Sequence, residues 1–302
     1  MWSTCCVTLV AASIFSLWVL AGGVEAFAAP ASTLARHHIT GTGLNLFNFG
    51  GGGSAGAGGA SSVPKSPAAR DSQAIGSIKA ALASPKNPSF RLVEAEFPVL
   101  AALNKLGDGS LRSAKEAEAA NLQFALKLAK SISIPFVGPK VYVVTSSTAS
   151  GSFAASAAKK AGASVISLKD GLPDFDATDI VIFLTPSTNA DYRTAESTAT
   201  SGTVGGVIII NGYAKDAKSV KQEATMGYFY KPLTYNSQIA GYLVREYPSK
   251  WTAIDAVTNS VLGTFTDEEI LVRKTNTPDL RTSVKLVQKS FDERAIEARR
   301  RG

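Results

Sequence analysis

Cysteine and histidine are nearly absent from this chain. The two cysteines are Cys5 and Cys6, the two histidines are His37 and His38, and residues 39–302 therefore hold neither type. Without a thiol or an imidazole, that long stretch can form no disulfide, no zinc site of Cys/His type and no Ser-His-Asp triad. Because most acid–base catalysis near neutral pH uses histidine, we expect a protein that is not an enzyme and that has no catalytic residue, metal or cofactor.

A strong excess of one charge is also missing. The net charge is +7, but residues 1–70 hold three basic groups and one acid, which leaves 28 Lys and Arg against 23 Asp and Glu in the rest of the chain. Three of those basic residues form the terminal run Arg299–Arg301. The remainder offers no broad basic face of the kind that nucleic acid requires. We therefore expect no nucleic-acid partner, and we interpret residues 296–302 as a solvated basic tail.

A long hydrophobic run occurs only once, over Cys6–Gly22. A membrane-spanning helix needs about 20 apolar residues, and the later run GGVIIING is much shorter, so we expect at most peripheral membrane contact. The sequence VEA at residues 24–26 follows the long run and has the small-x-small pattern that signal peptidase accepts. We predict a signal peptide over residues 1–26 that is cleaved after Ala26; the alternative is a retained anchor.

Acidic residues are missing from residues 27–70, which begin with Phe27 and contain Arg36, Lys65 and Arg70 among many hydroxyl and small residues and the run GGGGSAGAGGASS. This composition is typical of an organelle transit peptide. A signal peptide joined to such a segment at AFAAP resembles the bipartite plastid presequence of diatoms and related algae, in which a Phe at the junction directs import. We predict a location in the stroma or on the stromal face of the thylakoid, in an alga with a complex plastid; the alternative is a secreted protein with a flexible glycine-rich linker.

From residue 71 onward, hydrophobic strands alternate with amphipathic helices, which indicates βαβ units and a parallel sheet covered on both faces. Asp71 can cap the first helix, and Ser113 with Glu116 has the spacing of a capping box at the start of the second. The expected strands are residues 89–98, 140–147, 163–168, 178–187 and 205–212, and the expected helices are residues 72–84, 113–132, 152–162 and 188–200.

The pattern changes after Asn211. Short aromatic segments separated by turn residues are typical of an antiparallel meander, and a last helix is expected to begin at Thr277 with Pro278 at its first position. The meander segments are residues 227–233, 241–248, 251–257 and 260–267. We predict one α/β domain over residues 71–295. Its sheet is parallel in the first half with helices on both faces, antiparallel in the C-terminal half, and followed by a final C-terminal helix.

Two polar loops, TSSTASGS (145–152) and TPSTNADY (185–192), follow predicted parallel strands. Open α/β sheets bind ligands at that edge, and a helix N-terminus that follows hydroxyls and glycine suits an anion. Neither loop has a phosphate-binding pattern, and simple helix capping by the hydroxyls is the alternative. The candidate crevice residues are Ser146, Ser147, Thr148, Ser150 and Gly151.

Glu94 and Glu96 lie two apart on one predicted strand, so both point to the same face. Paired carboxylates can act as acid and base when their environments separate their pKa values. With no nearby histidine, we interpret them as structural residues that form salt bridges or face solvent.

The segment GYLVREYPSKW contains Arg245 and Trp251, and Trp251 is the only tryptophan after residue 26. Arginine and tryptophan are enriched at the energetic centres of protein interfaces, so both are candidate partner-binding residues. The alternative is that Trp251 closes the core and Arg245 pairs with a buried acid.

The segments RLVEAEFP, VIIINGY, GYFYKPL and GYLVREYPSKW, in this order, resemble a plastid and cyanobacterial family defined only as a domain of unknown function. That family includes a chloroplast factor of the low-photosystem-II-accumulation type and the C-terminal extension of a chloroplast adenylate kinase. The likeness covers residues 71–289, and its more specific pieces are the strand end Glu96–Pro98 and the R-x-Y-P-x-x-W pattern over Arg245–Trp251. The resemblance implies a thylakoid-associated plastid role and no established chemistry, because the kinase members carry that activity in a separate domain.

These observations together predict a non-enzymatic plastid protein that assists assembly or maintenance of the photosynthetic apparatus, in particular photosystem II. Its partners would be plastid proteins such as photosystem II subunits or assembly factors. The alternative is an α/β protein that binds a small ligand or nucleotide, or an enzyme, using the crevice near Ser146.

Overall fold

The computed structural model describes residues 60–99, 111–133, 138–149, 153, 164–212, 223–271 and 276–301. Several predictions concern residues outside this part of the chain. They are the signal peptide, the transit peptide before residue 60, the helix 152–162 apart from Phe153, and the candidates Ser150 and Gly151. No helix within the described residues is long and apolar enough to cross a membrane.

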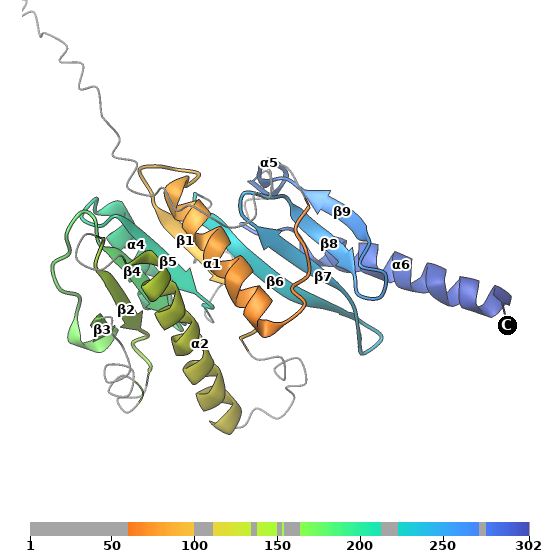
Figure 1. The fold of residues 1–302 in the computed structure, drawn as a ribbon, viewed down its shortest axis with the longest axis horizontal. Coiled ribbons are helices and arrows are strands. Elements are labelled where there is room, and N and C mark those ends of the chain that lie inside the picture. Colours follow the sequence, from red (N-terminus) through yellow and green to blue (C-terminus); the bar gives the residue numbers. More distant parts are fainter. Residues whose placement is uncertain are drawn as a thin grey trace, which may run out of the picture. The chain divides into compact units, whose positions relative to one another are not determined.

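Within the described ranges, nine strands form one mixed sheet in the order β3-β2-β4-β5-β1-β6-β7-β8-β9 (Figure 1). The first six strands in this order, β3 through β6, pair in parallel with their neighbours. The last four, β6 through β9, pair antiparallel. The predicted α/β fold, parallel first and antiparallel later, is therefore confirmed. The strands are β1 (Leu92–Glu96), β2 (Val141–Thr145), β3 (Ser164–Ser167), β4 (Ile180–Leu184), β5 (Gly206–Ile210), β6 (Thr225–Tyr235), β7 (Gln238–Glu246), β8 (Trp251–Asp255) and β9 (Val261–Phe265).

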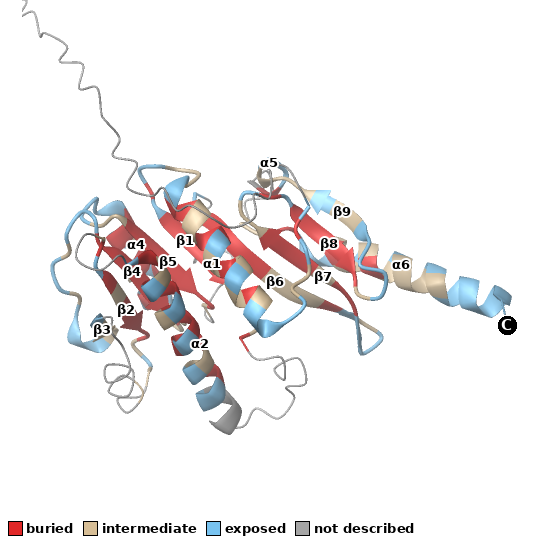
Figure 2. Cartoon of the chain, viewed as in Figure 1, coloured by how far each residue is buried: buried red, intermediate tan, exposed pale blue. Residues whose placement is uncertain are grey.

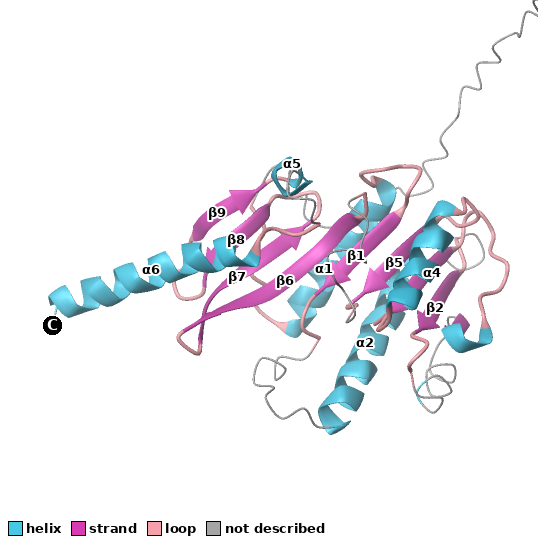
Figure 3. Cartoon of the chain, turned by 180° about the vertical axis from the view of Figure 1, so that it is seen from behind, coloured by secondary structure: helices cyan, strands magenta, loops and turns pink. Residues whose placement is uncertain are grey.

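Helices cover the sheet on both faces. The helices are α1 (Pro67–Ala83), α2 (Leu111–Ile132), α4 (Asn189–Thr200), α5 (Asp267–Leu271) and α6 (Leu280–Arg301), with a short 3-10 turn η2 (Leu168–Asp170). Helices α1 and α2 lie on one face, and α4 and α6 lie on the other (Figures 1 and 3). We call β1 to β5 with α1, α2 and α4 the parallel half, and β6 to β9 with α5 and α6 the antiparallel half.

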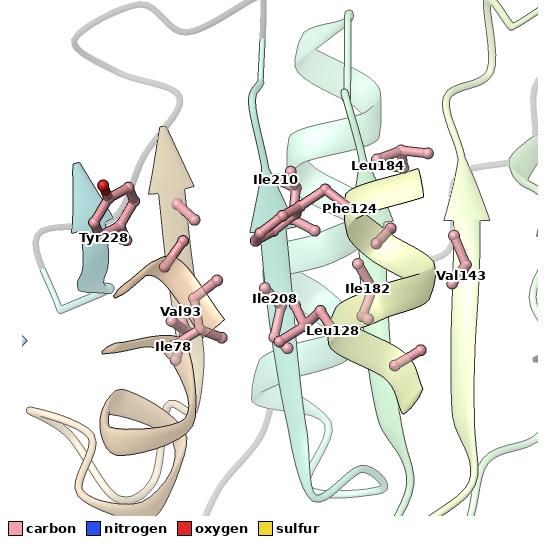
Figure 4. Close-up of a cluster of buried hydrophobic side chains, with 14 of the residues drawn as sticks. Ile78, Val93, Phe124, Leu128, Val143, Ile182, Leu184, Ile208, Ile210 and Tyr228 are labelled. Atoms are coloured by element: carbon pink, nitrogen blue, oxygen red, sulfur yellow. The ribbon is translucent and has the colours of Figure 1, made fainter. Parts of the chain in front are cut away.

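The parallel half has strands that are buried on both faces. Every residue of β4 and of β5 is buried, as expected for Val- and Ile-rich strands between two helical layers. On the α1 and α2 face, Phe124 and Leu128 of α2 pack with Ile182 and Ile208 of the central strands (Figure 4). On the opposite face, the aromatic ring of Tyr192 on α4 joins a second cluster. The strands of the parallel half therefore lie between two packed layers of helices.

The antiparallel half is closed by α6, which crosses β6 to β9 on a single face (Figure 3). Glycine permits this close approach at two positions: a Cβ on Gly241 would lie 2.7 Å from Val287, and a Cβ on Gly263 would lie 2.8 Å from Leu286. The last turns of α6 extend past the sheet and are exposed (Figure 2). The predicted final helix is thus present, and it packs by its first half.

Three predicted helix starts were wrong. Ser66, not Asp71, caps α1: its Oγ accepts from the Ala69 N–H at 3.1 Å, and Pro67 takes the first helical position. Helix α2 already includes Leu111, so Ser113 lies inside it. Helix α6 begins at Leu280.

The cap of α6 is supplied by Asp279, which lies after the predicted start at Thr277. Asp279 Oδ1 accepts from the Arg281 N–H at 3.1 Å, and its Oδ2 accepts from the Thr282 hydroxyl at 2.8 Å. The helix also continues to Arg301, so residues 296–301 are helical, although they are exposed as the prediction of a solvated tail expected. The starts of α1 and α6 differ from the predicted ones because another good capping side chain lies a few residues away in each case.

Candidate functional site

At the carboxyl edge of the parallel strands, the connections that leave the neighbouring strands β2 and β4 run in opposite directions across the sheet. From β2 the chain continues to β3 at the outer edge of the sheet, whereas from β4 it continues to β5 toward the centre. Adjacent strands whose connections diverge in this way form the crevice where open α/β sheets bind ligands. The predicted loops 145–152 and 185–192 leave β2 and β4 at this point.

These two loops contact each other through hydroxyl groups and one carboxylate. Ser146 Oγ donates to Asp191 Oδ2 at 2.7 Å and lies 2.7 Å from Ser187 Oγ. Thr148 Oγ1 lies 2.5 Å from Ser187 Oγ, and the Ser187 N–H donates to Asp191 Oδ2 at 3.1 Å. Ser146 and Asp191 are buried, Ser187 is half-buried and Thr148 is exposed. This hydroxyl cluster (Ser146, Thr148, Ser187 and Asp191) therefore runs from the interior to the surface.

Asp191 sits in the first turn of α4. Thr188 caps that helix, and its Oγ1 accepts from the Asp191 N–H at 3.1 Å. Burial raises the pKa of Asp191, but hydrogen bonds from the Ser147 and Ser146 hydroxyls and the Ser187 N–H outweigh burial and hold the pKa below its usual range. The helix dipole stabilises this negative charge. Because the Asp191 carboxylate already occupies this helix terminus, the geometry favours a neutral or cationic hydrogen-bond donor over an anion at this position.

Two residues at the ends of neighbouring strands adopt a left-handed backbone conformation. Thr185 after β4 and Asn211 after β5 both have φ 48°, which is unusual for a β-branched residue such as Thr. The Thr185 N–H donates to Ile210 O at 2.8 Å and the Asn211 N–H donates to Ala95 O at 2.9 Å, so each bend extends the pairing with the next strand. Phe97 N–H also donates to Asn211 Oδ1 at 2.7 Å. Strained positions of this kind cluster where a fold builds a site.

Several buried polar atoms beside this edge have no hydrogen-bond partner within the described chain. They include the hydroxyl of Tyr192 on α4, the side-chain amide nitrogen of Asn121 on α2 and Oδ1 of Asp191. A Cβ on Gly212 would collide with the Tyr192 hydroxyl, so glycine makes room for it just after β5. Burial, reinforced by the negative charge of Glu94, raises the pKa of the Tyr192 phenol well above its usual range. Buried polar groups normally have partners, so a bound water or ligand group would complete this edge.

The two strand glutamates have different partners. Glu94 is buried, and its Oε2 accepts from Asn276 Nδ2 at 2.9 Å, which ties the segment before α6 to β1. Glu96 Oε1 lies 3.8 Å from Lys231 Nζ on β6. Glu96 thus has an ion pair of the kind that we expected, whereas Glu94 is buried and accepts from an amide, which the interpretation did not include.

Arg245 and Trp251 are both inside the antiparallel half. Arg245 is 3% exposed and Trp251 is 0% exposed. Arg245 Nη2 donates to Asp267 Oδ2 at 2.9 Å, and Trp251 Nε1 donates to Asp267 Oδ1 at 3.1 Å. The hypothesis of a partner surface on these two residues is therefore corrected: they attach α5 to the sheet, which is the alternative that the sequence left open.

Both polar loops were predicted from the sequence, but candidate residues were chosen only from the loop after β2. The T-x-x-D spacing of Thr188 and Asp191 is a capping-box signal that could have identified the carboxylate, and the Asn-Gly pair after β5 could have identified the bend at Asn211. Tyr192 carries no such signal, because its contact depends on tertiary packing.

Comparison with known protein families, with characterised proteins and with solved structures gave no significant match. No group of three or more His, Cys, Asp or Glu side chains that could hold a metal ion occurs in the described part of the chain. The candidate binding surfaces are the polar loops after β2 and β4 in the parallel half and the solvent-exposed side of the antiparallel half.

Proposed function

We propose that this chain is a non-enzymatic plastid protein that assists the assembly or maintenance of photosystem II by binding another plastid protein through its antiparallel half. The family resemblance and the plastid-type presequence support the setting. The observation that carries the proposed mode of action is a group of exposed apolar side chains at one end of that half, formed by Ile239, Val257 and Val261. We call these three residues the apolar tip.

The strand pairing places the members of the apolar tip at the same end of the antiparallel half. Gly241 of β7 pairs with Asp255 of β8, and the Ala256 N–H donates to Ala240 O at 3.1 Å. Ile239 near the start of β7, Val257 in the turn after β8 and Val261 at the start of β9 therefore lie at the same end of the sheet. The three side chains are 38%, 70% and 50% exposed, respectively. Exposed apolar side chains that gather at one end of a fold are a common feature of protein–protein contact sites.

A buried carboxylate fixes the turn that presents Val257. Asp255 is 0% exposed, and its Oδ1 accepts from the Val257 N–H at 2.8 Å and from the Thr258 N–H at 2.9 Å. Its Oδ2 accepts from the Ser290 hydroxyl at 2.8 Å and pairs with Arg294 of α6. A turn that is already ordered loses little conformational freedom when it binds, which favours the apolar tip as a contact surface.

A pulldown from plastid membranes tests this proposal. The wild-type protein should capture photosystem II subunits or assembly factors, and the double variant Val257→Ser with Val261→Ser should lose them. Leu280→Ser is the matched control, because Leu280 is also an exposed apolar residue but lies at the start of α6. Equal capture by the double variant would remove the apolar tip from the proposal. Normal photosystem II levels in a knockout strain would remove the proposed function itself.

A second candidate function is the binding of a small polar ligand in the crevice of the parallel half. The convergence of the loops after β2 and β4 at the switch point, with Asp191 buried among hydroxyls, favours it. A thermal-shift screen with amines, polyols and nucleosides tests it, because a ligand at 100 times its Kd stabilises the fold by about 2.7 kcal/mol. A true ligand should lose its effect on Asp191→Asn and keep it on Asp174→Asn, which changes an exposed acid in the loop between η2 and β4.

A further inference from the structure

The residues just before α1 form a strap across the antiparallel half. Ala60 makes a parallel bridge to Lys250, and the Ser61 N–H donates to Thr252 Oγ1 at 3.0 Å. Ser61 Oγ donates to Lys250 O at 2.9 Å and accepts from the Glu246 N–H at 3.0 Å. Ser61 is 4% exposed and Thr252 is 0% exposed. This strap therefore satisfies polar groups that are buried near the ends of β7 and β8.

Arg70 in the first turns of α1 holds the segment after β1. Its Nη1 donates to Pro98 O at 2.7 Å and to Val99 O at 3.0 Å, and its guanidinium lies 5.2 Å from the centre of the Phe97 ring. Its Nη2 also donates to Asp71 Oδ1 at 2.6 Å. The Arg70 side chain is thus part of the buried structure.

Both features fall within residues 27–70, which the composition assigned to the targeting region. Of the three basic residues in that range, Arg70 is buried in the fold and Lys65 is exposed just before α1, which leaves Arg36 as the only basic residue upstream of residue 60. A mature chain that began at residue 71 would lack the strap, the cap of α1 and the Arg70 contacts. The buried Thr252 Oγ1 and the half-buried Glu246 N–H would then each lose a hydrogen-bond partner, which is costly.

We propose that proteolytic processing removes the presequence upstream of Ala60, so that the mature protein keeps residues 60–70. The step is the hydrolysis of one peptide bond by water, catalysed by a separate processing endopeptidase. It leaves a carboxylate on the released piece and a new α-amino group on the mature chain. The proposal rests on the expectation of a removable presequence and does not depend on the choice between partner binding and ligand binding.

Mapping the N-terminus of the protein purified from plastids tests the position of the cut. The mature chain should begin at Ala60 or at an earlier residue after Ala26. A mature N-terminus between residues 61 and 71 would overturn the proposal while leaving the presequence hypothesis intact. A chain that still begins at Met1 would overturn both.

A pair of charge variants of the full precursor tests the structural reason. Arg70→Gln should lower the Tm of the mature protein by several degrees and leave import unchanged, because its side chain is buried and bonded. Lys65→Gln removes the same charge from an exposed position and should change neither quantity. Impaired import of Arg70→Gln with an unchanged Tm would contradict the structural role and return residue 70 to the targeting segment.

Discussion

The two halves of the sheet share one layer of strands but leave different groups at the surface. In the parallel half, both faces are covered, and polar groups gather where the strands end, as at Ser146, Ser187 and Asp191. In the antiparallel half, buried polar side chains such as Asp255 and Trp251 are bonded internally, and apolar groups are left outside. All of the large exposed hydrophobic side chains among the described residues belong to this half, namely Ile239, Val257, Val261, Leu280 and Ile296. This difference is the basis of the two proposals, a small polar ligand for the parallel half and a protein partner for the antiparallel half.

The largest expected effect concerns the ion pair that holds the antiparallel half together. Arg245→Ala should reduce the free energy of unfolding by about 3–5 kcal/mol, because it leaves Asp267 without its buried partner. Lys86 Nζ lies 3.3 Å from the same carboxylate but is less buried. Lys86→Ala should cost only about 1 kcal/mol. Urea denaturation of both variants measures the difference, and equal losses would contradict the assignment of Arg245 to the core.

A pair of glycine substitutions tests the packing of α6. Gly241→Ala should destabilise the protein by about 1–3 kcal/mol, since its Cβ would lie 2.5 Å from Ile254 O and 2.7 Å from Val287. Gly76→Ala in α1 meets nothing within 4 Å and should stabilise the protein by about 0.5–1 kcal/mol, because alanine favours the helix. Thermal unfolding should therefore shift in opposite directions. A harmless Gly241→Ala would mean that α6 does not pack closely on β7.

The pH dependence of stability should reflect Asp255. Burial raises the pKa of this carboxyl, but hydrogen bonds from the Thr258 N–H, the Ser290 hydroxyl and Arg294 outweigh burial and hold the pKa far below its usual range. A lowered pKa means that the stabilisation is complete above about pH 4, the ordinary value for an unfolded Asp, and is lost as the pH falls below it. Asp255→Asn should therefore make stability less dependent on pH between about pH 4 and pH 2. The exposed Asp174→Asn serves as the control, and identical acid profiles for wild type and Asp255→Asn would refute this role.

The sequence predicted the strands well because hydrophobic periodicity depends on local burial. The run VIIIN indicated a strand buried on both faces, and Gly206–Ile210 is such a strand. Helix ends were less predictable, because Ser66 and Asp71 are both good caps and only the tertiary contacts of Arg70 with Pro98 and Val99 fix the helix start.

The candidate sites were only partly predictable for the same reason. The polarity of the loops after β2 and β4 was visible in the sequence, but their meeting at Ser146 and Asp191 depends on strand order. Arg245 and Trp251 both bond to Asp267, which lies beyond β9 and is far from them in the sequence, so their own segment could not show that they are buried. The apolar tip escaped prediction because exposure of Val257 depends on a turn held by α6.

The smallest expected effect on stability is at the apolar tip. Val257→Ser replaces a side chain that is 70% exposed, so the free energy of unfolding should change by less than about 0.5 kcal/mol. If the tip contacts a partner, the same substitution should weaken binding by about 1–2 kcal/mol. Denaturation and quantitative pulldown on one preparation separate these quantities, and a large loss of stability would show that Val257 has a structural role instead.

Complementation of a knockout strain tests the division between the two halves most directly. One line carries the apolar-tip variant Val257→Ser with Val261→Ser, and the other carries the crevice variant Ser146→Ala with Asp191→Asn, with photosystem II yield and the amount of each variant measured in both. We predict that the crevice variant restores photosystem II and that the apolar-tip variant does not, at equal protein levels. Rescue by the apolar-tip variant together with failure of the crevice variant would contradict the account and assign the function to the parallel half.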